Sequence, residues 1–231
     1  MRDIFRNRIE AGQLLAGKLM RYANQPNVIV LGLPRGGVAV AFEVAKALRA
    51  PLDVFVVRKL GTPGNREVAM GAIATGGVRV LNEEVVVGLG IPIEVIDAVT
   101  AEEKQELKRR ELAYRGSYSE PEVRGKTVIL IDDGIATGST VRAAVRALHA
   151  QHPARFIVAV PTAACSTYRE LRPEVDELVA LMRPEPFYGV GASYEDFSQM
   201  SDAEVTDLLE RARSCTASPD VAGAVETGGE E

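Results

Sequence analysis

The chain has 231 residues, of which 46% are hydrophobic and 26% are charged, the usual balance of a soluble globular protein that can bury a core. Its formal net charge of −5 argues against a general nucleic-acid or membrane surface, and no apolar run is long enough to span a bilayer. Cys165 and Cys215 form no CxxC pattern, so neither a disulfide framework nor a zinc site is indicated. Charges interrupt the apolar residues at the N-terminus, unlike a secretory signal, and we expect a cytoplasmic protein.

The first quarter of the chain predicts two helices and two buried strands. Apolar residues recur at helical spacing over residues 3–22, which predicts an amphipathic helix. The run VIVLGL at 28–33 is short and wholly apolar, as expected of a strand buried on both faces. The turn PRGG follows it and leads into a predicted helix at 38–48. A second buried strand is predicted at 52–57.

The next stretch is less regular. Residues 60–67, LGTPGNRE, are rich in Gly and Pro and predict a mobile loop. Short strands are predicted within 70–87. Thr100 and Glu103 have the spacing of a capping box, which predicts that a charged helix begins there and ends near Tyr114.

The second half of the chain alternates strands and helices. TVILI at 127–131 predicts a third buried strand, and the tail from Thr216 has almost nothing to bury, which predicts disorder. The other predicted elements are a helix at 140–150, a strand at 156–161, a short helix near 166–171, a strand at 177–182 and a last helix from a Ser201–Glu204 capping box to about Arg213.

This order of elements predicts an α/β fold with a doubly wound, mostly parallel five-stranded sheet. We expect one domain at 1–213 and a disordered tail at 214–231. Ligands of such sheets bind beyond the carboxyl ends of the strands. The loops that follow the strands, PRGG, RKLG and DDGIATGST, are therefore the candidate functional segments.

The stretch VILIDDGIATGST at 128–140 carries the most specific signal. Asp132 and Asp133 follow a buried strand at its end, where two adjacent carboxylates can serve one ligand. Carboxylates accept hydrogen bonds from the paired hydroxyls of a ribose and can hold a hydrated Mg²⁺. The small residues 136–140 precede a helix, so their N–H groups and hydroxyls can converge on a phosphate. One alternative is a solvated turn with a helix cap. Another is a receiver domain, whose acidic pair would lie near the N-terminus and not past the middle of the chain. A third is a nucleotide-binding P-loop, which would need a lysine that this loop lacks.

This stretch resembles the phosphoribosyl-pyrophosphate-binding signature of type I phosphoribosyltransferases. The resemblance implies that fold, with a flap at about 60–80, a C-terminal hood at about 183–200 and a homodimer. One departure is Gly134, where the family usually has an aliphatic residue; we expect it to loosen the local backbone. By resemblance, phosphoribosyl pyrophosphate contacts Arg35, Gly36, Gly37, Asp132, Asp133, Ala136, Thr137, Gly138, Ser139 and Thr140.

The resemblance also assigns catalytic roles to charged residues. Asp132 and Asp133 would act on the ribose and hold Mg²⁺ indirectly, while Arg35, Arg58 and Lys59 would stabilise the departing pyrophosphate. Each cation alone would be an ordinary surface charge. Together they lie at two neighbouring strand ends beside an acidic pair, which favours the catalytic interpretation.

The acceptor is expected at FYGVGASYEDF, residues 187–197, which looks distantly like the hood of the hypoxanthine-guanine enzymes. Phe187 or Tyr188 would stack on a base, and Glu195 or Asp196 would assist Mg²⁺ or a ring N–H. An aromatic-rich turn that only closes the core is about equally compatible. Ala136 stands where the hypoxanthine-guanine enzymes have an aspartate, and this departure leaves a purine only slightly favoured over other bases.

We therefore predict a Mg²⁺-dependent phosphoribosyltransferase that moves the 5-phosphoribosyl group to an acceptor, a nucleobase, and releases pyrophosphate. Its partners would be small molecules, with no nucleic acid and no membrane. The alternative is a non-catalytic protein of the same fold that senses phosphoribosyl pyrophosphate or a nucleotide.

Overall fold

The structure is a computed structural model that describes residues 4–216. Its centre is a five-stranded, all-parallel sheet of order β2-β1-β6-β7-β8, which confirms the predicted fold class. The register is continuous, and Gly32 at the end of β1 lies opposite Ile131 at the end of β6. The strands of this sheet are β1 (Val28–Gly32), β2 (Leu52–Val54), β6 (Thr127–Ile131), β7 (Arg155–Thr162) and β8 (Glu177–Met182).

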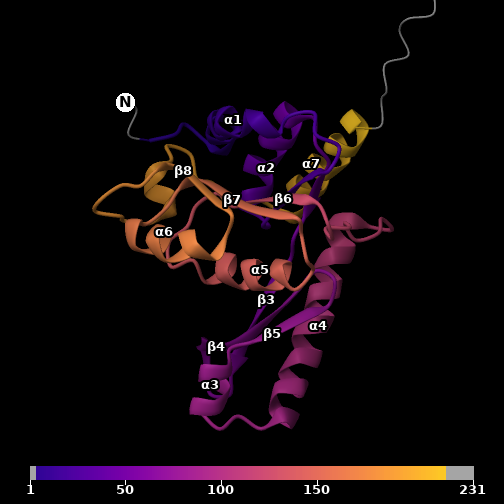
Figure 1. The fold of residues 1–231 in the computed structure, drawn as a ribbon, viewed down its shortest axis with the longest axis vertical. Helices are drawn as coiled ribbons and strands as arrows, with labels where there is room; N and C mark the ends of the chain where they lie inside the picture. The colour runs from indigo at the N-terminus through magenta and orange to yellow at the C-terminus, as the bar shows by residue number, and fades with distance from the viewer. Residues whose placement is uncertain (1–3, 217–231) are drawn as a thin grey trace, which may run out of the picture.

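Helices cover both faces of the sheet (Figure 1). Alternate residues of each central strand pack into two separate cores because successive side chains of a strand point to opposite faces. One face carries α1 (Arg8–Leu19), α2 (Gly36–Leu48) and α7 (Asp202–Thr216). The other face carries α5 (Ser139–His149) and α6 (Cys165–Leu171). Short 3₁₀ turns are η1 (Met20–Tyr22), η2 (Arg172–Glu174) and η3 (Val190–Ser193).

A second, three-stranded antiparallel sheet projects from the body together with two helices, at the bottom of Figure 1. We call residues 57–115 the arm. Leu60, Met70 and Ile73 of its sheet are buried together with Ile96 and Leu107 of its long helix. The arm consists of β3 (Val57–Thr62), β4 (Asn65–Ala74), β5 (Val78–Leu81), α3 (Glu83–Gly88) and α4 (Ile93–Arg115).

Four predictions within or beside the arm are wrong. The strands predicted within 70–87 end at Leu81, and Glu83–Gly88 form helix α3. The strand predicted at 52–57 ends at Val54, and Val57 already belongs to the arm. The loop conformation predicted at 60–67 is wrong, because β3 and β4 form a hairpin that turns at Gly64, whose φ is +78°; its role as a mobile flap stays a prediction. Such a φ suits glycine, so the Gly- and Pro-rich composition marks a tight turn and not an irregular loop.

The predicted capping box in the arm is also wrong. Helix α4 begins at Ile93, after Pro92, so Thr100 lies inside the helix and its hydroxyl donates to the Ile96 carbonyl at 2.7 Å. The Glu103 carboxylate accepts a hydrogen bond from Arg58 of β3 at 2.7 Å. This carboxylate is therefore held by a tertiary contact with β3, and it does not cap a helix.

The two ends of the chain also differ from prediction. Helix α1 begins at Arg8 and not at residue 3. The Asn7 side chain caps it by accepting a hydrogen bond from the Glu10 N–H at 3.0 Å. The capping box of α7 is confirmed: Ser201 N–H donates to Glu204 at 2.7 Å, and Glu204 N–H donates to the Ser201 hydroxyl at 3.2 Å. That helix continues to Thr216, and the rest of the predicted tail lies outside the described residues.

Within residues 4–216, no helix has both the length and the apolar character needed to cross a membrane.

A buried arginine fastens the arm to the body. The Arg115 side chain is 2% exposed; it donates to Asp53 at 2.8 Å, to the Val54 carbonyl at 2.6 Å and to Glu111 at 3.2 Å. Burial raises the pKa of the Asp53 carboxyl, against the opposing effect of the Arg115 charge. Breaking this contact would therefore leave a carboxyl group without its partner in a buried place.

We expect Arg115→Met to lower the free energy of unfolding by about 3–5 kcal/mol, the usual cost of removing one partner of a buried ion pair. Urea unfolding checks this. The control is Arg109→Met on the exposed face of α4, where Arg109 contacts Glu106 and little change is expected. Equal stability of the two variants would contradict the role given to Arg115.

Candidate active site

The acidic pair lies where the central strand β6 ends. The Asp133 N–H donates to the Asp132 carboxylate at 2.9 Å, so the chain turns at this point. The Asp133 carboxylate accepts a hydrogen bond from Nε of Arg8 at 2.8 Å, and the Asp133 carbonyl accepts one from the Tyr194 hydroxyl at 2.5 Å. Both carboxylates are thus held at the carboxyl edge of the sheet, as the sequence predicts.

The surroundings of the pair disfavour two negative charges. Burial raises the pKa of Asp132 to about 8, and the negative charge of Asp133 acts in the same direction. Burial also raises the pKa of Asp133, while the Arg8 guanidinium lowers it. In the free protein the pair therefore resists carrying two negative charges, and the Arg8 guanidinium compensates the charge on the Asp133 side.

This pKa predicts how stability depends on pH. Because the folded pKa of about 8 exceeds the ordinary value of 3.8, the folded chain binds a proton that the unfolded chain releases, and stability falls as pH rises through this interval. Asp132→Asn should remove this loss and raise the Tm at pH 8 by at least about 2 °C, with a smaller gain at pH 5. Calorimetric scans at both pH values check the prediction. A Tm gain of the Asn variant over wild type that is smaller at pH 8 than at pH 5 would contradict the prediction.

The PRGG turn approaches the acidic pair closely enough to require both glycines. A Cβ on Gly36 would lie 1.9 Å from the Asp133 carboxylate and 2.8 Å from Nε of Arg8. A Cβ on Gly37 would lie 2.8 Å from the Ile131 carbonyl oxygen and 2.9 Å from Cα of Asp132. Helix α2 begins at Gly36, so its free N–H groups face this region.

A pocket of about 330 Å³ joins these parts. It brings together predicted site residues from two neighbouring parallel strands: Arg35 and Gly36 after β1, and Asp132 and Asp133 after β6. The rest of its wall is Arg8, Pro34, Phe197, Gln199 and Met200.

The predicted phosphate loop leads into α5 as expected. Gly138 has a φ of +74°, and a Cβ there would lie 2.6 Å from the Thr167 side chain. The Thr167 hydroxyl donates to the Ala136 carbonyl at 2.6 Å, and the hydroxyls of Thr137 and Ser139 lie 3.2 Å apart on the surface. Exposed hydroxyls at the N-terminus of an 11-residue helix suit an anionic group. Thr140 follows them in the first turn of α5.

Gly134 has a different role from the one predicted. It is buried, and a Cβ would lie 2.5 Å from Val190 and 2.8 Å from Thr162. The absent side chain makes room for Val190, which precedes Tyr194 in the hood. Gly134 is therefore a packing contact between the acidic loop and the hood, and not a loosened backbone position.

Two predicted cations lie elsewhere. Arg58 and Lys59 line a hollow of about 680 Å³ between β3 and α4, and Arg58 is paired with Glu103 at 2.7 Å. The structure does not bring them into the pocket of the acidic pair.

The predicted acceptor residues lie outside that pocket as well. Tyr188 is 84% exposed, Phe187 is partly buried, and Glu195 is exposed. Asp196 accepts a hydrogen bond from the Ser198 N–H at 2.9 Å, which lowers the pKa of its carboxyl. None of these four belongs to the wall of the pocket as formed by the described residues.

Sequence reasoning missed Arg8 and Phe197. The guanidinium carbon of Arg8 lies 4.0 Å from the centroid of the Phe197 ring, which stacks on Tyr194 at 5.1 Å, and another Arg8 nitrogen donates to the Ser198 carbonyl at 2.8 Å. Arg8 is 125 residues from Asp133, and no local pattern distinguishes it from other arginines. Phe197 is the last residue of the aromatic segment predicted for the acceptor. Its aromatic character could have suggested a role in binding, but the sequence does not show that it faces the pocket.

No group of three or more His, Cys, Asp or Glu side chains in residues 4–216 could hold a metal ion unaided. The acidic pair could still contribute to Mg²⁺ binding, because Mg²⁺ in phosphate sites is held by one or two carboxylates together with waters and substrate oxygens.

Comparisons with known proteins point to one family. Residues 3–181 match the family model described as the phosphoribosyl transferase domain. Two Mycobacterium tuberculosis proteins, from strains H37Rv and CDC 1551 and each described as a putative phosphoribosyl transferase, are 44% identical over 209 residues. The match covers 90% of this chain and 47% of each relative, so the chain spans about half the length of the curated relatives it matches. The crystal structure of TT1426 from Thermus thermophilus is 39% identical and has a TM-score of 0.81, and the match covers 90% of this chain and 98% of that one.

Proposed function

The chain belongs to the phosphoribosyl transferase family, and on this premise we propose that it transfers the 5-phosphoribosyl group of phosphoribosyl pyrophosphate to an acceptor and releases pyrophosphate. The acceptor that we propose is a nucleobase, with a purine slightly favoured. The single observation that carries the proposal is the pocket in which the PRGG turn and the acidic pair meet at adjacent strand ends.

Each part of the donor has a matching group on this chain. The ribose hydroxyls would donate to Asp132 and Asp133, which are acceptors when ionised. The 5′-phosphate would bind residues 136–140 at the start of α5, and the pyrophosphate would bind Gly36, Gly37 and Arg35 at the start of α2. The donor would thus extend between two helix N-termini with its sugar over the acidic pair.

In the reaction, the bond from ribose C1 to the pyrophosphate oxygen breaks, and its electron pair leaves with pyrophosphate. A ring nitrogen of the acceptor forms the new bond to C1, and its proton passes to the pyrophosphate that leaves. Positive charge that develops on the ribose is stabilised by the adjacent carboxylates, and negative charge on the leaving group by Arg35 and the α2 N–H groups. Exclusion of water matters because water would otherwise take the place of the acceptor.

Mg²⁺ is part of the proposal. Asp132 and Asp133 would contact it through water, and it would supply positive charge to the phosphate oxygens of the donor. The Asp133 oxygen that accepts from Arg8 is already engaged, so this oxygen would contact Mg²⁺ through water and not directly.

Arg58 and Lys59 remain a separate proposal. They could act on the leaving pyrophosphate only after the β3–β4 hairpin moved toward the pocket. A movement of the hairpin away from α4 would break the pair between Arg58 and Glu103. The same observation favours the second candidate function, a protein that binds phosphoribosyl pyrophosphate or a nucleotide as a signal. A sensor needs the donor site but not these cations or an acceptor pocket.

The experiment is pyrophosphate release from phosphoribosyl pyrophosphate and Mg²⁺ across a panel of purine and pyrimidine bases. Asp132→Asn/Asp133→Asn serves as the blank. Release that depends on one base and disappears in the double variant would establish the transferase and identify its acceptor. Donor binding without release by any base would favour the sensor. The homodimer that we propose by family analogy is checked on the same sample by light scattering.

A further inference from the structure

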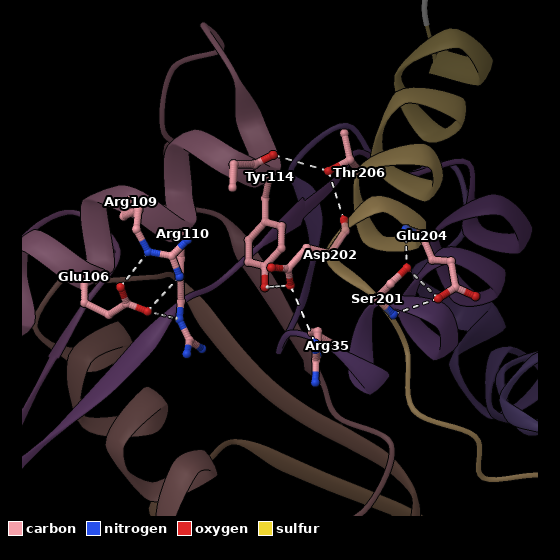
Figure 2. Close-up of polar contacts among 10 residues, drawn as sticks. Arg35, Glu106, Arg109, Arg110, Tyr114, Ser201, Asp202, Glu204 and Thr206 are labelled. Carbon is pink, nitrogen blue, oxygen red and sulfur yellow. Dashed lines mark hydrogen bonds and ion pairs between the residues drawn. The ribbon is translucent and has the colours of Figure 1, made fainter.

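Arg35, which would bind the pyrophosphate, has a counter-ion outside the pocket. Its guanidinium lies 3.9 Å from the carboxylate of Asp202, the first residue of α7 (Figure 2). The capping box formed by Ser201 and Glu204 fixes the backbone on which Asp202 lies. The position of the carboxylate is therefore set by the start of a helix and not by a free loop.

The same carboxylate oxygen is anchored by the arm. It accepts a hydrogen bond from the Tyr114 hydroxyl at 2.8 Å, and the Tyr114 side chain is buried at the end of α4. Burial and the Asp202 charge raise the pKa of Tyr114 to about 12, so this hydroxyl keeps its proton at physiological pH. A second contact joins the two helices, from the Thr206 hydroxyl to the Ala113 carbonyl at 3.2 Å.

Arg109 and Arg110 of α4, which lie close to Tyr114 and Asp202 in sequence or in Figure 2, share Glu106 as their anionic partner. Glu106 accepts hydrogen bonds from Arg109 at 2.7 Å and from Arg110 at 2.8 Å, all on α4. These contacts lower the pKa of Glu106 to about 2, so it stays ionised. Arg35, in contrast, reaches Asp202 only at the limit of an ion pair, and both side chains are partly exposed, at 37% and 52%. Such a pair is weak, and a polyanion can displace it.

We propose that Asp202 is a positioning residue for Arg35: it holds the guanidinium at the rim of the pocket in the free protein and yields it to the pyrophosphate group of the ligand. Tyr114 fixes Asp202, so the end of α4 sets the resting position of a cation at the pocket. This inference rests on the proposed role of Arg35 in pyrophosphate binding, but it does not require transfer to any acceptor.

The test is calorimetric titration with inorganic pyrophosphate in the presence of Mg²⁺. Asp202→Asn keeps the size of the side chain and an oxygen that can accept from Tyr114, but it removes the charge that competes for Arg35. We expect it to tighten pyrophosphate binding by about threefold to tenfold, the effect of one charge at this distance in a partly exposed place. The matched control is Asp207→Asn, which removes the same charge from α7 at a residue paired with Arg211, and which should leave binding unchanged.

Two further variants separate positioning from general electrostatics. In an Arg35→Gln background, Asp202→Asn should no longer tighten binding, because the two residues act through one contact. Tyr114→Phe should shift binding in the same direction as Asp202→Asn, by less. Equal tightening by Asp207→Asn, persistence of the effect without Arg35, or the absence of pyrophosphate binding by the wild-type protein would each overturn the proposal. If this coupling is found but no base supports pyrophosphate release, then transfer fails and the positioning role stands.

Discussion

Asp133→Asn is expected to reduce the rate of phosphoribosyl transfer by about a hundredfold to a thousandfold, the usual loss when one preorganised contact to the transition state is removed. The substitution keeps the size of the side chain. It removes the negative charge that would stabilise the ribose, and its amide lies beside the Arg8 guanidinium, which donates to this position at 2.8 Å. An amide nitrogen turned toward Arg8 would place two donors together, so the oxygen must face Arg8 and the nitrogen the ligand.

The measurement is kcat/KM for pyrophosphate release, with the Tm of the variant as a check on folding. Asp207→Asn is the matched control, because it is an exposed carboxylate on α7 that pairs with Arg211 and lies outside the pocket wall. A loss of less than about threefold in Asp133→Asn would show that this carboxylate does not hold the reacting sugar.

Gly36→Ala is expected to weaken binding of phosphoribosyl pyrophosphate by about tenfold to a hundredfold, which corresponds to the 1–3 kcal/mol that overpacking usually costs. The added Cβ would lie 1.9 Å from the Asp133 carboxylate, a distance that real atoms do not adopt. Either the carboxylate or the turn must move, and in both cases the two halves of the proposed donor site separate.

The control is Gly17→Ala in α1, where a Cβ meets nothing within 4 Å. That substitution should leave binding unchanged and raise stability by up to about 1 kcal/mol, since alanine favours a helix over glycine. Unchanged affinity in Gly36→Ala would mean that the PRGG turn is not part of the donor site.

The central sheet was predictable because strands of a parallel sheet are buried on both faces and stand out as continuous apolar runs. The strands 127–131 and 177–182 were predicted with their observed bounds. The arm was not predictable in the same way. Its hairpin buries only some residues, such as Leu60 and Met70, against α4, so it has no continuous apolar run. Its glycines and proline are residues that usually indicate a loop.

The candidate site was predictable where neighbouring residues supply it. The acidic pair and the PRGG turn each lie in one short segment at a strand end, and topology alone brings them together. Arg8 contacts Asp133 and Asp202 contacts Arg35, and both lie at the starts of helices whose sequences carry no sign of the site. The choice of Tyr188 for the acceptor side relied on residue type, which does not show whether an aromatic ring faces a pocket or the solvent.

The measurement that tests the proposed donor site most directly is calorimetric titration of phosphoribosyl pyrophosphate with Mg²⁺ into the wild-type protein and into Asp132→Asn/Asp133→Asn. We predict saturable binding of one donor per chain, lost in the double variant while the fold remains intact by its Tm. No binding to the wild-type protein, or equal binding to both, would contradict the assignment of the acidic pair as the place where the ribose is held.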